Sequence, residues 1–231
     1  MSATGPTTTA VLAADWNELT PELWLSFQQT VYMVVWTMLI AGLLGLVLGV
    51  ALYTTRRGGL FQNGPSFAVL NVLVNIIRPI PFIIFITAVG PLTLLVMGTT
   101  IGTRSVLFPM SFMATFVIGR IVEQNLVSVD PGVVEAARAM GASRFRIVWS
   151  VLVPEALGPL ILGYTFIFIA VVDMSAMAGY VGGGGLGNFA ITYGYQQFDW
   201  PVTLVTVVII IVIVQAAQLL GNRLARIALR R

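Results

Sequence analysis

The sequence predicts an all-α integral membrane protein with five transmembrane helices. Of its 231 residues, 58% are hydrophobic and only 9% are charged, and the mean hydropathy is +0.94. Soluble domains carry about 25% charged residues, so this composition excludes an ordinary soluble core. Five apolar segments also reach the length of about 20 residues that a bilayer-spanning helix needs. At this length a single domain is expected.

The five expected spans cover most of the chain. They are, in order, residues 31–53, 79–101, 106–126, 156–177 and 202–220. The second contains three prolines, Pro79, Pro81 and Pro91, which remove backbone donors and are tolerated at membrane depth only against protein or water. The prolines therefore place this segment near a cavity or the permeation path.

Two shorter segments have a different expected character. Residues 16–24 follow a Thr-rich, disordered tail and are expected to form a short interfacial helix. Residues 61–78 are more amphipathic than a span and are expected to lie along the membrane or enter it. We thus divide the chain into an extracytoplasmic tail (1–23), a transmembrane domain (24–222) with a loop at about 130–154, and a basic tail (223–231).

The arginines set the expected orientation. Nine of the twelve basic residues fall in three places that an odd number of spans puts on one side, namely Arg56, Arg57, Arg138, Arg144, Arg146, Arg223, Arg226, Arg230 and Arg231. Basic residues collect on the cytoplasmic side of membrane proteins. The N-terminus is therefore expected outside and the C-terminus in the cytoplasm. A basic segment that would open a secretory signal is absent before Arg56.

Composition also restricts the chemistry of the chain. It contains no Cys and no His, and every basic residue is Arg. Thiol chemistry is excluded, and the commonest metal ligand and general base is missing. A P-loop needs a Lys on the nucleotide phosphates. We therefore expect no catalytic residue, metal site or cofactor on this chain, so that any ATP and Mg²⁺ would be bound by a partner.

The loop between the third and fourth spans has its own helical pattern. Asp130 and Pro131 predict an N-cap followed by proline at the first helical position. Glu135 then falls in the early turns, where the helix dipole favours an acid. Gly141 is expected to stop this helix, and a second helix is expected to start near Arg144. The alternative is a solvated loop without a binding role, whose short helices have ordinary caps.

Within this loop, Glu135, Ala136, Ala137 and Gly141, with Pro154 thirteen residues later, resemble the EAA loop of bacterial ABC importer permeases. Two further segments resemble the methionine branch of that family. They are N-I-I-R-P-I-P-F-I-I at residues 75–84, and S-A-M-A-G-Y-V-G-G-G-G-L-G at 175–187 followed by Y-G-Y at 193–195. Pro79 and Asp173 depart from the pattern, which usually has Ser and a small residue there.

The resemblance implies a type I ABC importer permease in the bacterial cytoplasmic membrane. It implies a homodimer, two cytoplasmic ABC ATPase subunits, an extracytoplasmic substrate-binding lipoprotein and contact with lipid, but not with nucleic acid. The expected activity is uptake of methionine, in both L and D forms, and of close derivatives by alternating access. The residues expected to couple to the ATPase are Glu135, Ala136, Ala137, Arg138, Met140, Gly141 and Pro154. Those expected at a gate or along the path are Arg78, Pro81, Ser175, Met177, Gly182, Gly185 and Gly187.

Several alternatives stay open. The chain could be an ABC permease for another amino acid or small solute, or an intramembrane enzyme that uses Asp173, Glu123 and Arg120. Arg120 and Glu123 could pair or extend separately to the interface. Asp173 is expected to be held by Ser175 or Tyr180 in a helix contact, although an intramembrane acid is a functional candidate by default.

The glycines at 182–187 satisfy G-x-G-x-x-G. They lack the strand and βαβ unit of a dinucleotide site, so we expect close packing or a gate-like turn instead.

Overall fold

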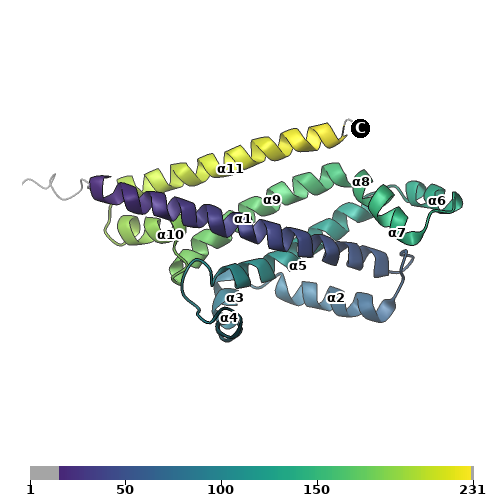
Figure 1. Cartoon of the computed structure of the whole chain (residues 1–231), viewed down its shortest axis with the longest axis horizontal. Coiled ribbons are helices and arrows are strands. Elements are labelled where there is room, and N and C mark those ends of the chain that lie inside the picture. Colours follow the sequence, from purple (N-terminus) through teal and green to yellow (C-terminus); the bar gives the residue numbers. More distant parts are fainter. Residues whose placement is uncertain (1–15, 230–231) are drawn as a thin grey trace, which may run out of the picture.

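The computed structural model describes residues 16–229, and every regular element in that part of the chain is helical. The elements form an elongated bundle (Figure 1). In chain order they are α1 (Trp16–Thr55), α2 (Gly64–Ile77), α3 (Phe82–Ala88), α4 (Gly90–Met97), α5 (Leu107–Val127), α6 (Pro131–Ala139), α7 (Arg144–Ile147), the π-helix η1 (Val148–Leu152), α8 (Val153–Glu155), α9 (Leu157–Tyr180), α10 (Gly185–Phe189), the π-helix η2 (Ala190–Tyr195) and α11 (Trp200–Leu229).

The helix α1 corrects the expected interfacial helix at residues 16–24. These residues are the first turns of one continuous helix of 40 residues, which is about 60 Å long. Pro21 lies in its second turn, where the missing N–H removes one hydrogen bond near a helix end and does not break the helix. The expected tail at residues 1–15 lies outside the described residues.

The second expected span, residues 79–101, is also wrong as a single helix. The chain bends by 108° between α2 and α3, because Pro79 and Pro81 cannot donate to the preceding turn. Pro91 starts α4, and Gly98 at φ 75° ends it. The amphipathic segment that precedes the bend forms α2, which lies against α1 and α5.

Three other expected spans are present as α5, α9 and α11; α5 and α9 shift by no more than three residues at either end, whereas α11 continues nine residues beyond the expected end at 220. The helices α1, α9 and α11 are each long and apolar enough to cross a membrane alone. Two bent pairs, α2 with α3 and α5 with α6, raise the possible number of spans to five. The all-α membrane fold predicted from composition is thus confirmed.

The core of the bundle lies where α1, α5 and α9 meet. Its side chains are apolar and almost fully inaccessible, as for Met33, Ile118 and Ile167. In contrast, α11 exposes much of its apolar surface, including Leu204, Val208 and Val212. Burial inside one chain therefore does not account for the hydrophobicity of α11, which is expected of a helix that faces lipid or another subunit.

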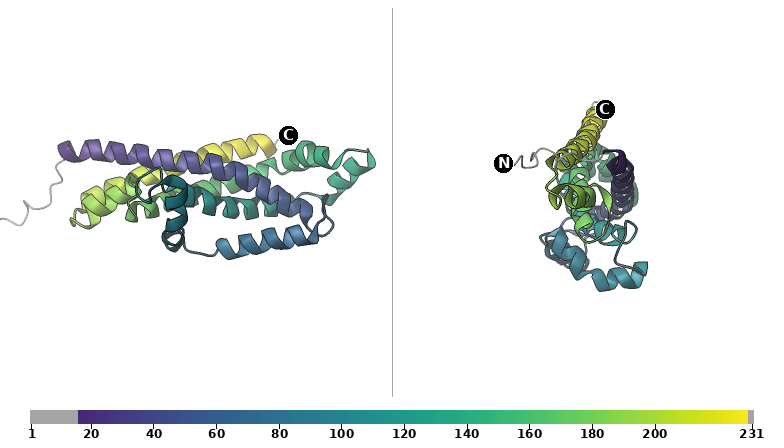
Figure 2. Two further views of the ribbon diagram at one scale, coloured as in Figure 1. Left: turned by 60° about the horizontal axis from the view of Figure 1, so that its bottom comes forward. Right: turned by 90° about the vertical axis from the view of Figure 1, so that its left-hand side faces the viewer.

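The two ends of the bundle differ in what they carry. The end of α1, the α6–α7 loop and the end of α11 lie together at one end, and the start of α1 lies at the other (Figures 1 and 2). The arginine groups that follow α1, lie in the loop and close α11 therefore share one end. Arg230 and Arg231 lie outside the described residues. The membrane orientation of this end stays a prediction.

Candidate functional site

The loop helix α6 forms as its sequence predicts. The Asp130 carboxylate accepts a hydrogen bond from the Gly132 N–H at 2.8 Å, and Pro131 is the first helical residue. Gly141 follows the helix at φ 78°, a conformation that residues with a Cβ adopt only at a cost. The Ala142 N–H then donates back to the Ala137 carbonyl at 3.1 Å. The cap, the helix and its stop are confirmed.

A second short helix completes the loop. Ser143 caps α7 by accepting a hydrogen bond from the Arg146 N–H at 3.3 Å, and the chain passes through η1 and α8 into α9. Pro154 lies in α8, with its side chain exposed. The loop is therefore connected to α9 by an almost continuous helical path.

One face of α6 is buried and the other is free. Val134 and Ala137 are buried, and α6 contacts η1. Glu135, Ala136 and Arg138 are exposed. Met140 is 81% exposed. This free face carries Arg138 and Met140, two residue types that are enriched at protein–protein interfaces.

The sequence reasoning missed two aromatic residues beside this surface. Phe145 is 69% exposed and lies 6.2 Å, between ring centroids, from Trp149. An aromatic residue between two arginines, Arg144 and Arg146, is unusual in a solvated loop and was the available signal. We call Glu135, Arg138, Met140 and Phe145 the loop surface.

The expected path residues fall into three groups. Arg78, Pro81 and Met177 line one pocket of about 260 Å³, which we call the α2–α9 pocket, together with Met113, Asp173 and Met174. Ser175 is buried, and its hydroxyl donates to the Val172 carbonyl at 2.6 Å. Gly182 lies in the connection from α9 to α10, Gly185 and Gly187 lie in α10 itself, and none of the three lines this pocket.

Asp173 differs from its expected role. It is exposed in the single chain, and within residues 16–229 its side chain makes no hydrogen bond or ion pair, so the expected contact with Ser175 or Tyr180 is not formed. Tyr180 is itself 69% exposed. The helix α9 turns the Asp173 side chain toward the α2–α9 pocket and the Ser175 side chain toward the core.

The glycine-rich segment 182–187 is held against α1. The Gly185 N–H donates to the Gln29 side chain at 2.7 Å, and the Leu186 N–H donates to the Thr30 hydroxyl at 2.8 Å. The Gly182 carbonyl accepts from the Gly102 N–H at 2.9 Å. These contacts favour the packing alternative for this segment.

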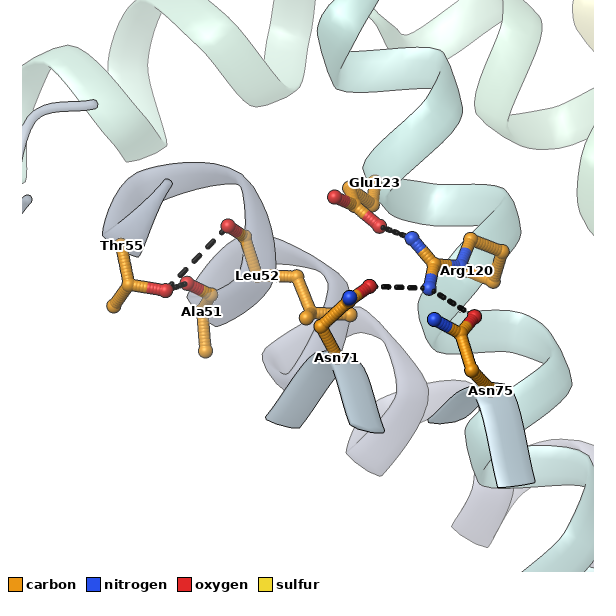
Figure 3. Close-up of polar contacts among 7 residues, drawn as sticks. All are labelled: Ala51, Leu52, Thr55, Asn71, Asn75, Arg120 and Glu123. Atoms are coloured by element: carbon orange, nitrogen blue, oxygen red, sulfur yellow. Dashed lines mark hydrogen bonds and ion pairs between the residues drawn. The ribbon is translucent and has the colours of Figure 1, made fainter. Parts of the chain in front are cut away.

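A polar network joins α2 to α5 (Figure 3). The Arg120 guanidinium pairs with the Glu123 carboxylate at 2.6 Å and donates to the side-chain oxygens of Asn71 and Asn75, each at 2.7 Å. The expected Arg120–Glu123 pair is confirmed. The two asparagines were missed, although their spacing of four residues puts them on one helix face.

We expect Asn71→Ala to loosen α2 from α5. The change removes one hydrogen bond to the Arg120 guanidinium, and such interhelical bonds contribute about 1 kcal/mol. Chemical unfolding in mixed micelles should show this loss, and the loss should shrink when Arg120 is already replaced by Met. The exposed Asn222→Ala is the control. Equal losses in both backgrounds would show that the network does not hold α2.

Three comparisons relate the chain to known proteins. A family model described as binding-protein-dependent transport system inner membrane component matches residues 43–231. The probable D-methionine transport system permease protein MetI of Vibrio cholerae is 42% identical over 214 residues, covering 92% of this chain and 95% of the relative. The methionine import system permease protein MetP of Bacillus subtilis is 39% identical over 210 residues, covering 91% and 95%.

A solved structure shares the fold. In a structure of inward facing conformations of the MetNI methionine ABC transporter, one chain is 36% identical to this one and superimposes with a TM-score of 0.89. The match covers 91% of this chain and 98% of that chain.

Proposed function

Because the chain belongs to the family of binding-protein-dependent transport system inner membrane components, we propose that it is the permease subunit of an ATP-driven methionine importer. Relatives named as methionine permeases match more than nine-tenths of it. The substrate would include L- and D-methionine and close derivatives.

One observation carries the proposed coupling to an ATPase. The loop surface protrudes from a capped helix whose other face is buried against η1. Such a helix can receive force on its free face and pass it on through its buried face. We therefore assign docking of a cytoplasmic ABC ATPase to this surface. The ATPase partner would bind ATP and Mg²⁺. The complex would contain two permease copies and two ATPases.

The helical path gives the mechanism. The helix α6 contacts η1, η1 contacts α8, and α8 contacts α9, which lines the α2–α9 pocket. Movement of the loop would therefore tilt α9 relative to α2 and change access to the pocket. The match to a transporter in inward facing conformations supports an inward-facing state for the present chain. ATP would close the two ATPases on each other. This closed ATPase pair would favour the outward-facing state of the permease because it binds that state better.

The enzyme alternative has little support from the geometry. Arg120 pairs with Glu123 and donates to the α2 residues Asn71 and Asn75. The α2–α9 pocket contains one acid, Asp173, and no second titratable acid that could share proton transfer with it. A transporter role needs no such pair.

The test is reconstitution of the complete transporter in proteoliposomes with its ATPase and a methionine-binding lipoprotein. We expect ATP-dependent uptake of methionine and stimulation of ATP hydrolysis by the loaded binding protein. Uptake of a different amino acid, with no competition from methionine, would support the permease for another solute.

We expect the loop end of the bundle to face the cytoplasm. The chain has no cysteine, so Glu18→Cys at the start of α1 and Met140→Cys in the loop report their positions separately. An impermeant maleimide should label the first in intact cells and the second only after permeabilisation. The reverse pattern would contradict both the orientation and the docking of a cytoplasmic ATPase.

A further inference from the structure

The α2–α9 pocket lies at the break between α2 and α3. The helix α2 is about 21 Å long, and Asp173 lies about 24 Å along α9. Both distances are measured from the start of each helix, on the side of the loop, so in an apolar layer about 30 Å thick the pocket lies toward the far side of that layer. Irregular backbone at such depth is tolerated where it lines a cavity.

Two opposite charges face this pocket without a partner. Arg78 and Asp173 both line it, yet within residues 16–229 the one ion pair joins Arg120 to Glu123. An unpaired charge at membrane depth is unfavourable by about 2.5–3.5 kcal/mol on insertion scales. A site that keeps one cation and one anion apart is suited to a ligand that carries the complementary two charges.

From this arrangement we propose that the α2–α9 pocket binds a free α-amino acid during transport, with Arg78 on its carboxylate and Asp173 on its ammonium group. The proposal rests on the proposed function as an importer. It assigns selection of the zwitterion to the permease itself, in addition to any selection by a binding protein.

The volume of the pocket and the charges of its two ionic side chains restrict which ligand fits. A volume of about 260 Å³ lies just below the range of about 300–1,000 Å³ for ligand pockets. It therefore suits a single amino acid better than a peptide. A simple anion would leave Asp173 unpaired, and a simple cation would leave Arg78 unpaired. The zwitterion satisfies both.

The apolar wall suits a flexible side chain. Met113 and Met174 are buried and Met177 is half-buried, and all three line the pocket. Thioethers are polarizable and adapt to irregular shapes. This wall would accept an unbranched apolar side chain such as that of methionine, and also its close derivatives.

The site would also change during the transport cycle. Arg78 follows α2, whereas Asp173 lies on α9, which is connected to the loop through α8 and η1. A tilt of α9 would alter the separation of the two charges. A ligand held by both would then bind one state more tightly than the other, as release requires.

The experiment uses the complete transporter, permease with ATPase, and photo-methionine, a diazirine analogue with free amino and carboxylate groups. Ultraviolet crosslinking followed by peptide mapping should label the segments of this chain around 78–83 or 170–177. Asp173→Asn and Arg78→Gln should each reduce this labelling roughly tenfold or more, since each loses a hydrogen bond between charged groups. Glu22→Gln and Arg104→Gln, both exposed and outside the pocket, are the matched controls.

Competitors test each contact without relying on the variants alone. Against the wild-type protein, L-methionine should prevent labelling, whereas N-acetyl-L-methionine, which lacks the ammonium, and L-methioninamide, which lacks the carboxylate, should compete weakly. In Asp173→Asn, methionine should lose its advantage over the N-acetyl compound but keep it over the amide. In Arg78→Gln the pattern should be reversed. A purely structural role for either residue would not produce this crossed pattern.

The possible results separate the two proposals. If the wild-type protein imports methionine but the label maps elsewhere, or both variants compete as the wild-type protein does, the amino-acid site is wrong and the importer stands. If the wild-type protein imports a different amino acid and that amino acid alone prevents labelling, the methionine assignment fails and the zwitterion site stands. If Asp173→Asn does not assemble, equal competition by all three compounds in the wild-type protein overturns the proposal.

Discussion

Glu135→Lys is expected to reduce ATP-dependent uptake at least about tenfold while the protein still inserts and dimerises. Glu135 is exposed in the second turn of α6, and its side chain makes no hydrogen bond or ion pair within the described residues. Its replacement therefore costs little within this chain. At a docking surface, however, reversing one charge removes an attraction and adds a repulsion, which together exceed about 1.4 kcal/mol. Uptake into proteoliposomes and ATPase co-purification measure the effect.

The control for this change is Glu155→Lys. Glu155 is exposed in α8, outside the loop surface, and we expect reversal of its charge to preserve uptake.

A second pair of variants tests the turn after α6 instead of the charge on α6. Gly141→Val and Gly58→Val both place a β-branched residue at a strongly positive φ with open space around it. Only the change at 141 should uncouple transport. Parental uptake by Glu135→Lys with the ATPase bound would contradict the docking assignment.

The loop could be predicted because its signals are local. Asp130 and Pro131 start a helix and Gly141 stops one through contacts with their own neighbours. Nothing distant in the chain has to be known. The same holds for the Arg120–Glu123 pair, whose members are one helical turn apart.

The second span could not be predicted because hydropathy measures composition and not direction. Residues 79–101 are apolar enough to cross a membrane, yet the prolines divide them into α3 and α4. The preceding segment, which looked less apolar, forms the helix α2. Its asparagines made it look amphipathic, whereas they bind Arg120 of α5. Only the packed structure shows that contact.

The role of Asp173 depended on helix rotation. On a helix, residues two positions apart point to nearly opposite sides, so the spacing of Asp173 and Ser175 separates their side chains but does not say which of them faces a pocket. In the structure, Ser175 is buried, while Asp173 faces the pocket that also contains Arg78. Those two charges are 95 positions apart in the sequence, so no local pattern brings them together.

Gly187→Ala is expected to destabilise the protein by about 3 kcal/mol, toward the upper end for overpacking. A methyl group at 187 would overlap the Ala176 backbone, with its Cβ 2.5 Å from the Ala176 Cα. Backbone cannot rotate away as a side chain can. The helix α10 must therefore move off α9, which also strains the hydrogen bonds from Gly185 and Leu186 to α1.

Thermal unfolding in detergent, followed by the loss of the folded peak in size-exclusion chromatography, measures this effect. Gly179→Ala tests the opposite side of the same contact, because a Cβ there would lie 3.0 Å from the Gly187 carbonyl carbon and closer still to the Asn188 backbone. Gly64→Ala is the matched control, since nothing lies within 4 Å of its added methyl. Because the clash acts on packing and not on the path, any Gly187→Ala protein that does fold should keep its apparent affinity for methionine. If Gly187→Ala instead unfolds at the wild-type temperature but loses uptake, the glycine-rich segment 182–187 acts as a moving gate.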